Sequence, residues 1–310
     1  MAHGHTKQRA GQGEGPRRAL VLSGGGARAV WQVGACQHLI AERGYWFDVI
    51  AGVSAGAVNG ATLAQARDLD DLAAELEHLR AVWFGIRGNR DIYGRRWLGP
   101  LGMVLGRRAS LHETGPLRRV LEQHIDPGRV AASPIGLRVG YVDLLSGRYR
   151  TAGNDDPALV DAVLASCAVP LFFPPVPLRD GRELGVDGGV RNATPVSDAL
   201  RALSERPARG VEPDEVWVLV PRPLRRVSEG HVRDWWDVTR RSLSVLTEEA
   251  FAGNIEQVQD EPPAPVTLRV LHPREELRGP ILDFAPERLR HWYDDGLQAA
   301  REVRVAESAA

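Results

Sequence analysis

Ser54 lies at the centre of Gly52-Val53-Ser54-Ala55-Gly56, a GxSxG motif whose serine could act as a nucleophile. The run from Phe47 to Ala51 is short, apolar and rich in β-branched residues, as in a buried strand, and Ala57 begins a helix of small residues. Strand, GxSxG and helix form a nucleophile elbow, whose tight turn requires the flanking glycines. A bare GxSxG is also a common Gly/Ser turn, so the flanking elements favour the catalytic interpretation. We expect the Ser54 hydroxyl at the carboxyl edge of a sheet, where a helix dipole favours developing negative charge.

A glycine loop, Ser23–Arg28, joins an earlier short strand, Ala19–Leu22, to a helix. The loop is similar to a dinucleotide-binding turn, but that fingerprint requires an acidic residue at the end of the next strand, and Asp48 begins its strand. The alternative is an oxyanion hole, in which several backbone N–H groups converge on one oxygen. Loops that follow adjacent parallel strands end beside each other, so we expect this loop next to Ser54. A tight turn without a ligand is the remaining interpretation.

Asp187 is the candidate base, because it again lies where a short strand ends in glycines. A carboxylate presented there can accept the serine proton directly. Aspartate before glycine is also a common turn signal, so the residue alone would favour a turn. A competing arrangement is an α/β-hydrolase triad of Ser54, Asp187 and His272, since His272 follows the predicted strand Val266–Leu271. That fold normally places several strands before its elbow, whereas one precedes it here.

The elements that must position these groups have the pattern of an α/β protein. Trp31, Gly34, Ala35 and Leu39 recur at helical steps before Gly44 ends the helix. Two strand, glycine loop and helix units in succession imply a parallel sheet covered on both faces. Further helices are predicted at Leu69–Trp83, Glu113–His124, Asp156–Cys167, Arg233–Val258 and Ala285–Val303, and further strands at Leu137–Leu144, Arg148–Thr151, Leu184–Asp187, Glu215–Val220 and Val266–Leu271.

The bulk properties suit an ordinary globular chain of 310 residues, with 43% hydrophobic and 25% charged residues. A net charge of −1 argues against a global field that recruits nucleic acid or anionic lipid. Cys36 and Cys167 are expected to be buried free thiols, which fits a reducing compartment and a cytoplasmic location.

Residues 1–18 are polar and unpatterned, so we expect a disordered leader followed by one domain over 19–310. No apolar run is long enough to span a bilayer. No metal or nucleotide motif is present, so no cofactor is expected.

Four blocks in order resemble those of the patatin-like phospholipase family. They are Ser23–Arg28, GVSAG at 52–56, Ser166 with Pro170, and Asp187-Gly188-Gly189. Asn192–Val196 and the terminal helix around Tyr293 and Gly296 fit as well. The resemblance covers about residues 20 to 300, and it is weakest over 85–115 and 201–265.

The resemblance implies a three-layer α/β/α fold with a mostly parallel central sheet. It also implies an acyl hydrolase that acts on a lipid or other acyl ester with a Ser–Asp dyad and no histidine. Carried over by position, Ser54 is the nucleophile, Asp187 the general base, and Gly24, Gly25 and Gly26 the oxyanion loop, with Arg28 beside them. Ser23 replaces the aspartate that commonly opens the glycine block, and Ala29 replaces the usual glycine or lysine. A catalytically silent module that binds lipid or anions with the same loops is the alternative from another class.

The segment 85–115 is a candidate flap at the mouth of the site. Arg95-Arg96 and Arg107-Arg108 bracket an apolar stretch that contains Trp97 and Leu101. Arginine pairs beside tryptophan and leucine suit a lipid interface, which predicts peripheral contact with a membrane. The alternative is a loop that packs its apolar residues on the domain.

Overall fold

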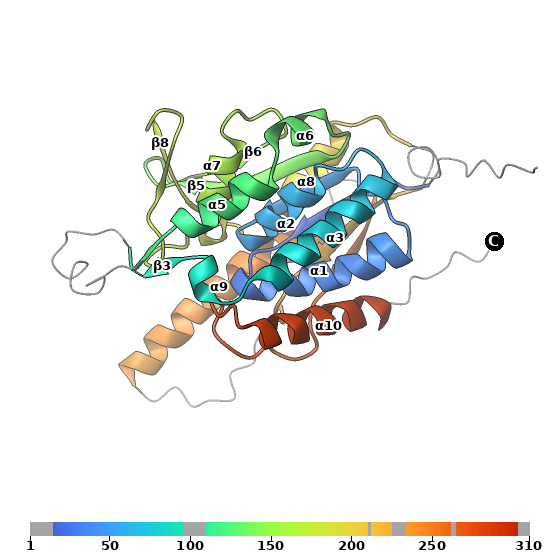
Figure 1. Cartoon of the computed structure of the whole chain (residues 1–310). Helices are drawn as coiled ribbons and strands as arrows, with labels where there is room; N and C mark the ends of the chain where they lie inside the picture. The colour runs from blue at the N-terminus through green and yellow to red at the C-terminus, as the bar shows by residue number, and fades with distance from the viewer. Residues whose placement is uncertain (1–14, 96–109, 210–211, 225–233, 262–264, 303–310) are drawn as a thin grey trace, which may run out of the picture.

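The computed structural model describes residues 15–95, 110–209, 212–224, 234–261 and 265–302, and these are organised around one large sheet (Figure 1). The sheet has eight strands in the order β10-β9-β1-β2-β5-β8-β7, with β6 paired to β5. Strands β10, β9, β1, β2 and β5 are parallel, while β6, β8 and β7 pair with their neighbours in the antiparallel sense. The strands are β1 (Arg18–Leu22), β2 (Val49–Val53), β5 (Gly136–Asp143), β6 (Arg148–Ala152), β7 (Val176–Leu178), β8 (Glu183–Asp187), β9 (Asp214–Leu219) and β10 (Val266–Leu271).

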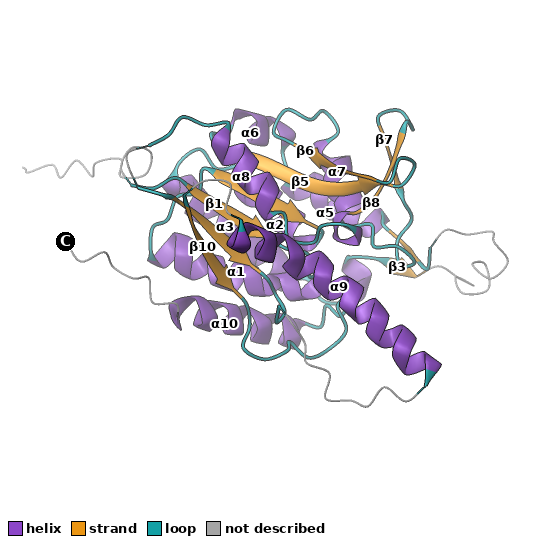
Figure 2. Ribbon diagram, turned by 180° about the vertical axis from the view of Figure 1, so that it is seen from behind, coloured by secondary structure: helices purple, strands orange, loops and turns teal. Residues whose placement is uncertain are grey.

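Helices cover both faces of this sheet, as Figures 1 and 2 show from opposite sides. One layer comprises α1 (Val30–Cys36), α2 (Ala55–Leu63), α3 (Leu69–Gly85), α5 (Gly115–His124), α7 (Leu159–Ser166) and α10 (Pro286–Glu302). The other comprises α8 (Val196–Ser204) and α9 (Trp235–Asp260), and the short α6 (Pro127–Ala132) follows α5. The predicted three-layer α/β/α fold with a mostly parallel sheet is therefore confirmed. In the described part of the chain, no helix combines the length and apolar character needed to cross a bilayer.

Strand β1 shows why both faces must be covered. Leu20 and Leu22 pack in the core on the α1 side, whereas Ala19 and Val21 pack in a second core with α8 and α9. All four are completely buried. Such continuous apolar strands are typical of parallel sheets between two helical layers.

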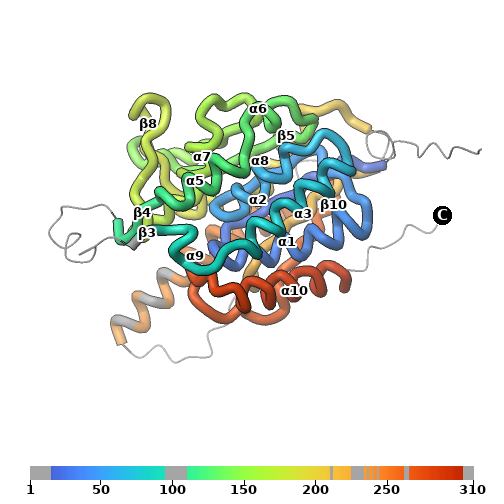
Figure 3. Tube along the Cα trace, in the orientation of Figure 1, coloured from blue at the N-terminus to red at the C-terminus, as the bar shows by residue number. Residues whose placement is uncertain are grey.

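Helices α1 and α10 run side by side along the outside of one layer (Figure 3). Gly34 and Gly296 permit this close approach, because a Cβ atom at Gly34 would overlap the Tyr293 carbonyl oxygen and one at Gly296 would overlap that of Trp31. Gly44 has a φ of +67°, as expected for the glycine that ends the first helix. The terminal helix thus closes the layer that begins directly after the glycine loop.

Several sequence predictions of local structure are confirmed within one or two residues. The predicted hairpin is β5 with β6, and both cysteines are buried and free. Strand β1 begins at Arg18, where Arg17 and Arg18 form ion pairs with Asp214 and Glu215. Residues 1–14 of the predicted leader lie outside the described residues. In the predicted flap, β3 (Gly94–Arg95) pairs with β4 (His112–Glu113), while 96–109, with Trp97 and Leu101, also lie outside them.

Candidate active site

Ser54 occupies a strained turn between β2 and α2. Its backbone has φ 58° and ψ −134°, a conformation that costs a non-glycine residue about 1–3 kcal/mol. A Cβ at Gly52 would overlap the Gly56 carbonyl, and one at Gly56 would overlap the Leu22 carbonyl. The GxSxG spacing is therefore required by backbone packing on both sides of the serine. The predicted nucleophile elbow is present, and its serine side chain is 7% exposed.

The backbone of Ser54 is hydrogen-bonded to Ser166, the last residue of α7. The Ser54 N–H donates to Ser166 Oγ at 2.8 Å, and that hydroxyl donates to the Gly140 carbonyl of β5 at 2.6 Å. Ser166 is fully buried. The sequence pattern marked Ser166 but gave it no role, and the structure shows that it fixes the elbow to the neighbouring strand.

Asp187 lies beside Ser54, at the end of β8 and opposite Tyr141 of β5. The Ser54 hydroxyl lies close to its carboxylate, and the Gly189 N–H donates to Oδ1 at 2.7 Å. Burial raises the pKa of Asp187 to about 6, against the lowering effect of the Ser54 hydroxyl and of the Gly189 N–H. A carboxylate with a pKa near neutrality, in contact with a serine hydroxyl, is suited to accept its proton.

The glycine loop lies against Ser54, since a Cβ at Gly24 would stand 3.3 Å from Ser54 Cβ. Its N–H groups are not equivalent. Gly24 N–H donates to the Ala193 carbonyl at 3.0 Å, and Ala27 N–H donates to Ile281 at 2.7 Å. In the described part of the chain, the N–H groups of Gly25 and Gly26 have no hydrogen-bond partner. These two groups are therefore available to a substrate oxygen, whereas Gly24 is used to anchor the loop.

Two residues that depart from the family pattern leave the loop in place. Ser23 is fully buried, and its hydroxyl donates to the Leu219 carbonyl at 3.2 Å. Gln32 Nε2 donates to the Ser23 carbonyl at 2.7 Å. Ala29 is fully buried as well. The loop is thus tied to the end of β9 by neutral groups where the family commonly has an aspartate.

Arg28 holds the loop from its outer side. Its guanidinium donates to the Gly279 carbonyl at 2.8 Å and lies 3.7 Å from the Glu276 carboxylate. The side chain also lines the cleft above Ser54. Arg28 therefore connects the glycine loop to the segment before α10, which is a positioning role.

The cleft lies where the sheet changes its winding direction. From β1 the chain passes through α1 to β2, while from β9 it passes through α9, on the other face, to β10. Ligands of open α/β sheets bind at such switch points. The loops after β1 and β9 both line the cleft, which spans about 880 Å³, including space open to solvent, and contains Ser54 and Asp187. Pro221 and Arg222, from the loop after β9, also line it, and sequence reasoning did not identify them because only the strand order brings them there.

A second, apolar cavity begins at the same serine. It spans about 810 Å³, including space open to solvent, between α2, α3 and α5, and its lining includes Ser54, Val58, Trp83 and Leu121. The cleft and the cavity share Gly26, Ser54, Val169 and Leu282. Ser54 thus stands between a cleft with polar groups and a cavity with apolar walls.

His272 is not brought to this site. It follows β10, which is three strands away from β2, a separation of about 14 Å at normal strand spacing. Its side chain is exposed, and Nδ1 lies 3.0 Å from the Pro273 carbonyl. Among the described residues, no histidine lines the cleft that contains Asp187. The geometry therefore favours the Ser–Asp pair over the triad.

Two known proteins are similar to this chain in sequence. A cGAMP-activated phospholipase of Escherichia coli is 29% identical over 195 residues, which are 56% of this chain and 52% of that protein. An uncharacterized NTE family protein of Mycobacterium tuberculosis is 31% identical over 230 residues, which are 69% of this chain and 57% of that protein. The chain thus spans about half the length of these curated relatives.

Two solved structures also align with the chain. VipD from Legionella pneumophila has a TM-score of 0.45 at 13% identity, covering 94% of this chain and 67% of that one. The type III effector ExoU has a TM-score of 0.37 at 14% identity, covering 93% of this chain and 52% of that one. The family model of patatin-like phospholipases matches residues 20–200, which include the glycine loop, the elbow and Asp187. The chain belongs to the patatin-like phospholipase family.

Proposed function

We propose that this protein is a lipid acyl hydrolase that cleaves carboxylic esters with Ser54 and Asp187. Asp187 accepts the hydroxyl proton as Ser54 Oγ attacks the ester carbonyl carbon. The N–H groups of Gly25 and Gly26 bind the resulting oxyanion. The proton then passes from Asp187 to the leaving alkoxide, which departs as an alcohol and leaves an acyl-enzyme. Water, deprotonated by Asp187, attacks the acyl-enzyme, and Ser54 regains its proton as the carboxylic acid leaves.

The observation that carries this proposal is the position of Ser54, with Asp187 beside it, at the junction of two spaces. An ester that bridges them would place its acyl chain in the apolar cavity and its alcohol portion in the cleft. The family membership and the named phospholipase relative support lipid esters as the substrate class. A cytoplasmic location remains a prediction from sequence.

The direct test is hydrolysis by the purified full chain. We expect release of p-nitrophenol from p-nitrophenyl octanoate, and release of fatty acid from a phospholipid mixture, both absent with Ser54→Ala. If the wild type released no more product than Ser54→Ala on every ester, a silent lipid-binding module would replace the enzyme proposal. Activity on the soluble ester but on no phospholipid would retain the hydrolase and exclude the phospholipase.

Gly25→Val should reduce turnover by about 100-fold or more, the usual cost of losing an oxyanion donor. A Cβ at Gly25 would stand 2.5 Å from Pro221 Cγ, so the loop must shift and carry its N–H groups with it. Gly85→Val is the matched control, because nothing lies within 4 Å of a Cβ at Gly85. Steady-state kinetics on a soluble ester measures the effect, and near-normal turnover of Gly25→Val would make the loop purely structural.

We also propose peripheral contact with a lipid surface, through α9. Its first half extends beyond the body of the molecule (Figure 2). Trp235, Val238, Val245 and Leu246 are exposed on one side of this helix, with Trp235 75% and Leu246 67% exposed. Val190 and Ile281, also exposed, line the cleft. Apolar side chains at the entrance to a lipid-ester site support an interfacial role.

The double variant Trp235→Ser, Leu246→Ser should bind phosphatidylcholine vesicles at least about tenfold more weakly, since each apolar side chain contributes about 1.5–3 kcal/mol when buried. Hydrolysis of soluble p-nitrophenyl butyrate should be retained, because neither residue lines the cleft. Gln259→Ser, another exposed residue of α9, serves as the control in vesicle co-sedimentation. Parallel loss of vesicle binding and soluble-ester hydrolysis would instead indicate a structural role for the two side chains.

A further inference from the structure

The apolar cavity is built from three matching helical stripes. Helix α2 contributes Ala55, Val58 and Thr62, α3 contributes Leu79, Val82 and Trp83, and α5 contributes residues at steps of three, four and seven from Leu117 to His124. Residues at this spacing lie on one face of a helix. The cavity therefore follows α2 away from Ser54, and Thr62 marks its distal end along that helix.

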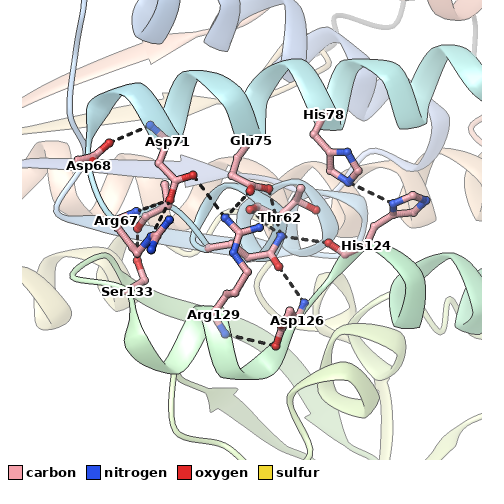
Figure 4. Close-up of polar contacts among 12 residues, drawn as sticks. Thr62, Arg67, Asp68, Asp71, Glu75, His78, His124, Asp126, Arg129 and Ser133 are labelled. Atoms are coloured by element: carbon pink, nitrogen blue, oxygen red, sulfur yellow. Dashed lines mark hydrogen bonds and ion pairs between the residues drawn. The ribbon is translucent and has the colours of Figure 1, made fainter.

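A polar cluster around His124 lies at this end of the cavity (Figure 4). His124, at the end of α5, lines the cavity, and its Nδ1 lies 3.1 Å from His78 Nε2 of α3. Gln65 Nε2 donates to the His124 carbonyl at 3.0 Å and to Glu75 at 3.2 Å. Glu75 in turn forms an ion pair with Arg129 of α6 at 2.6 Å. The end of α5 thus contacts Gln65, which follows α2, and His78 of α3.

His124 is suited to meet the end of an apolar chain. Burial and the neighbouring His78 lower the pKa of His124, so the ring is neutral at pH 7. Its side chain is only partly buried, and His78 on its outer side is exposed. The ring therefore separates the cavity from solvent without placing a charge at its end.

We infer that the His124 ring is the end wall of an acyl-chain pocket and limits the chain of the substrate to about ten carbons. At a rise of about 1.5 Å per residue, Ser54 to Thr62 spans about 12 Å. With a carbon–carbon bond of about 1.5 Å, an extended alkyl chain advances roughly 1.25 Å per carbon, so about ten carbons reach the wall. The substrate class is then an ester of a medium-chain acid. This inference rests on the proposed function, which places the acyl carbonyl at Ser54.

The test compares p-nitrophenyl esters of four to sixteen carbons. For the wild type we expect kcat/KM to peak near ten carbons and to fall at least about tenfold by sixteen, because a longer chain meets the wall and can fit only by withdrawing methylenes from the apolar pocket. His124→Ala opens the end of the cavity and should recover most of that loss. His78→Ala removes the same hydrogen bond but no lining atom, so its chain-length profile should match the wild type.

A second variant and a binding measurement keep the inference testable if His124→Ala does not fold. Val58 lies about 6 Å along α2 from Ser54, so Val58→Phe should shift the optimum to about four to six carbons. Calorimetric titration of Ser54→Ala with decanoate and palmitate reports the pocket without catalysis. If Ser54→Ala binds decanoate more tightly than palmitate but the wild type hydrolyses no ester, the proposed function is overturned and the pocket is retained. If the wild type is active, but its kcat/KM does not depend on chain length and neither His124→Ala nor Val58→Phe changes this, the end wall is overturned and the hydrolase is retained.

Discussion

Ser54→Ala is expected to abolish ester hydrolysis, with a loss on the order of a million-fold, comparable to removal of the nucleophile in other serine hydrolases. Ser54 faces Asp187 and stands where the cleft and the apolar cavity meet. Alanine keeps the Cβ and the backbone of the elbow, so the site should otherwise persist. A fluorophosphonate probe, followed by peptide mass spectrometry, should label the wild type at Ser54 and leave the variant unlabelled.

Ser54→Gly provides the matched control for folding. Both variants lack the nucleophile, but only glycine relieves the strain of φ 58° and ψ −134°. Relief of about 1–3 kcal/mol exceeds the cost of about 0.5–1 kcal/mol for the freer unfolded chain of a glycine variant. Ser54→Gly should therefore unfold at a higher temperature than Ser54→Ala. If the fluorophosphonate probe still labels both Ser54→Ala and Ser54→Gly, the nucleophile is another residue.

The elbow and the turn after Asp187 could be read from sequence because backbone packing imposes their glycines. Gly52 and Gly56 leave no room for a Cβ, and a Cβ at Gly188 would stand 2.5 Å from the Gly140 carbonyl oxygen. The burial of β1 on both faces likewise follows from its uninterrupted apolar run. Local sequence predicts the structure best at positions where backbone packing leaves room only for glycine.

Other features depend on contacts between distant segments, which no local pattern reports. Pro221 joins the cleft because β9 lies beside β1. Gly24 is removed from the set of free oxyanion donors by the Ala193 carbonyl, which lies far along the chain. The proposed end wall at His124 depends on α5, which lines the same cavity as α2 and α3. The sequence therefore located the candidate catalytic residues, while the walls of the cleft and the cavity required the assembled structure.

Asp187→Asn should lower kcat/KM by roughly 100- to 10,000-fold, the range that general-base catalysis usually supplies. Asparagine keeps the size of the side chain and can still accept the Gly189 N–H through its oxygen. It cannot take the Ser54 proton. His272→Ala should retain most activity, because His272 is exposed and three strands away from the elbow. The reverse ranking in steady-state kinetics would favour the α/β-hydrolase triad.

The raised pKa of Asp187 leads us to expect that both activity and stability depend on pH. Asp187 must be ionised to act, so kcat/KM should rise with pH through about 6 and then level off, and Asp187→Asn should lack that rise. Burial raises the Asp187 pKa from 3.8 to about 6, so the folded state holds its proton more tightly than the unfolded state. This group therefore lowers the free energy of unfolding as pH increases from about 4 to about 6, by about 3 kcal/mol in total. Relative to the wild type, Asp187→Asn should gain stability over that interval, measured by urea unfolding at several pH values. A stability difference that does not change with pH would show that Asp187 is not a carboxyl with a raised pKa.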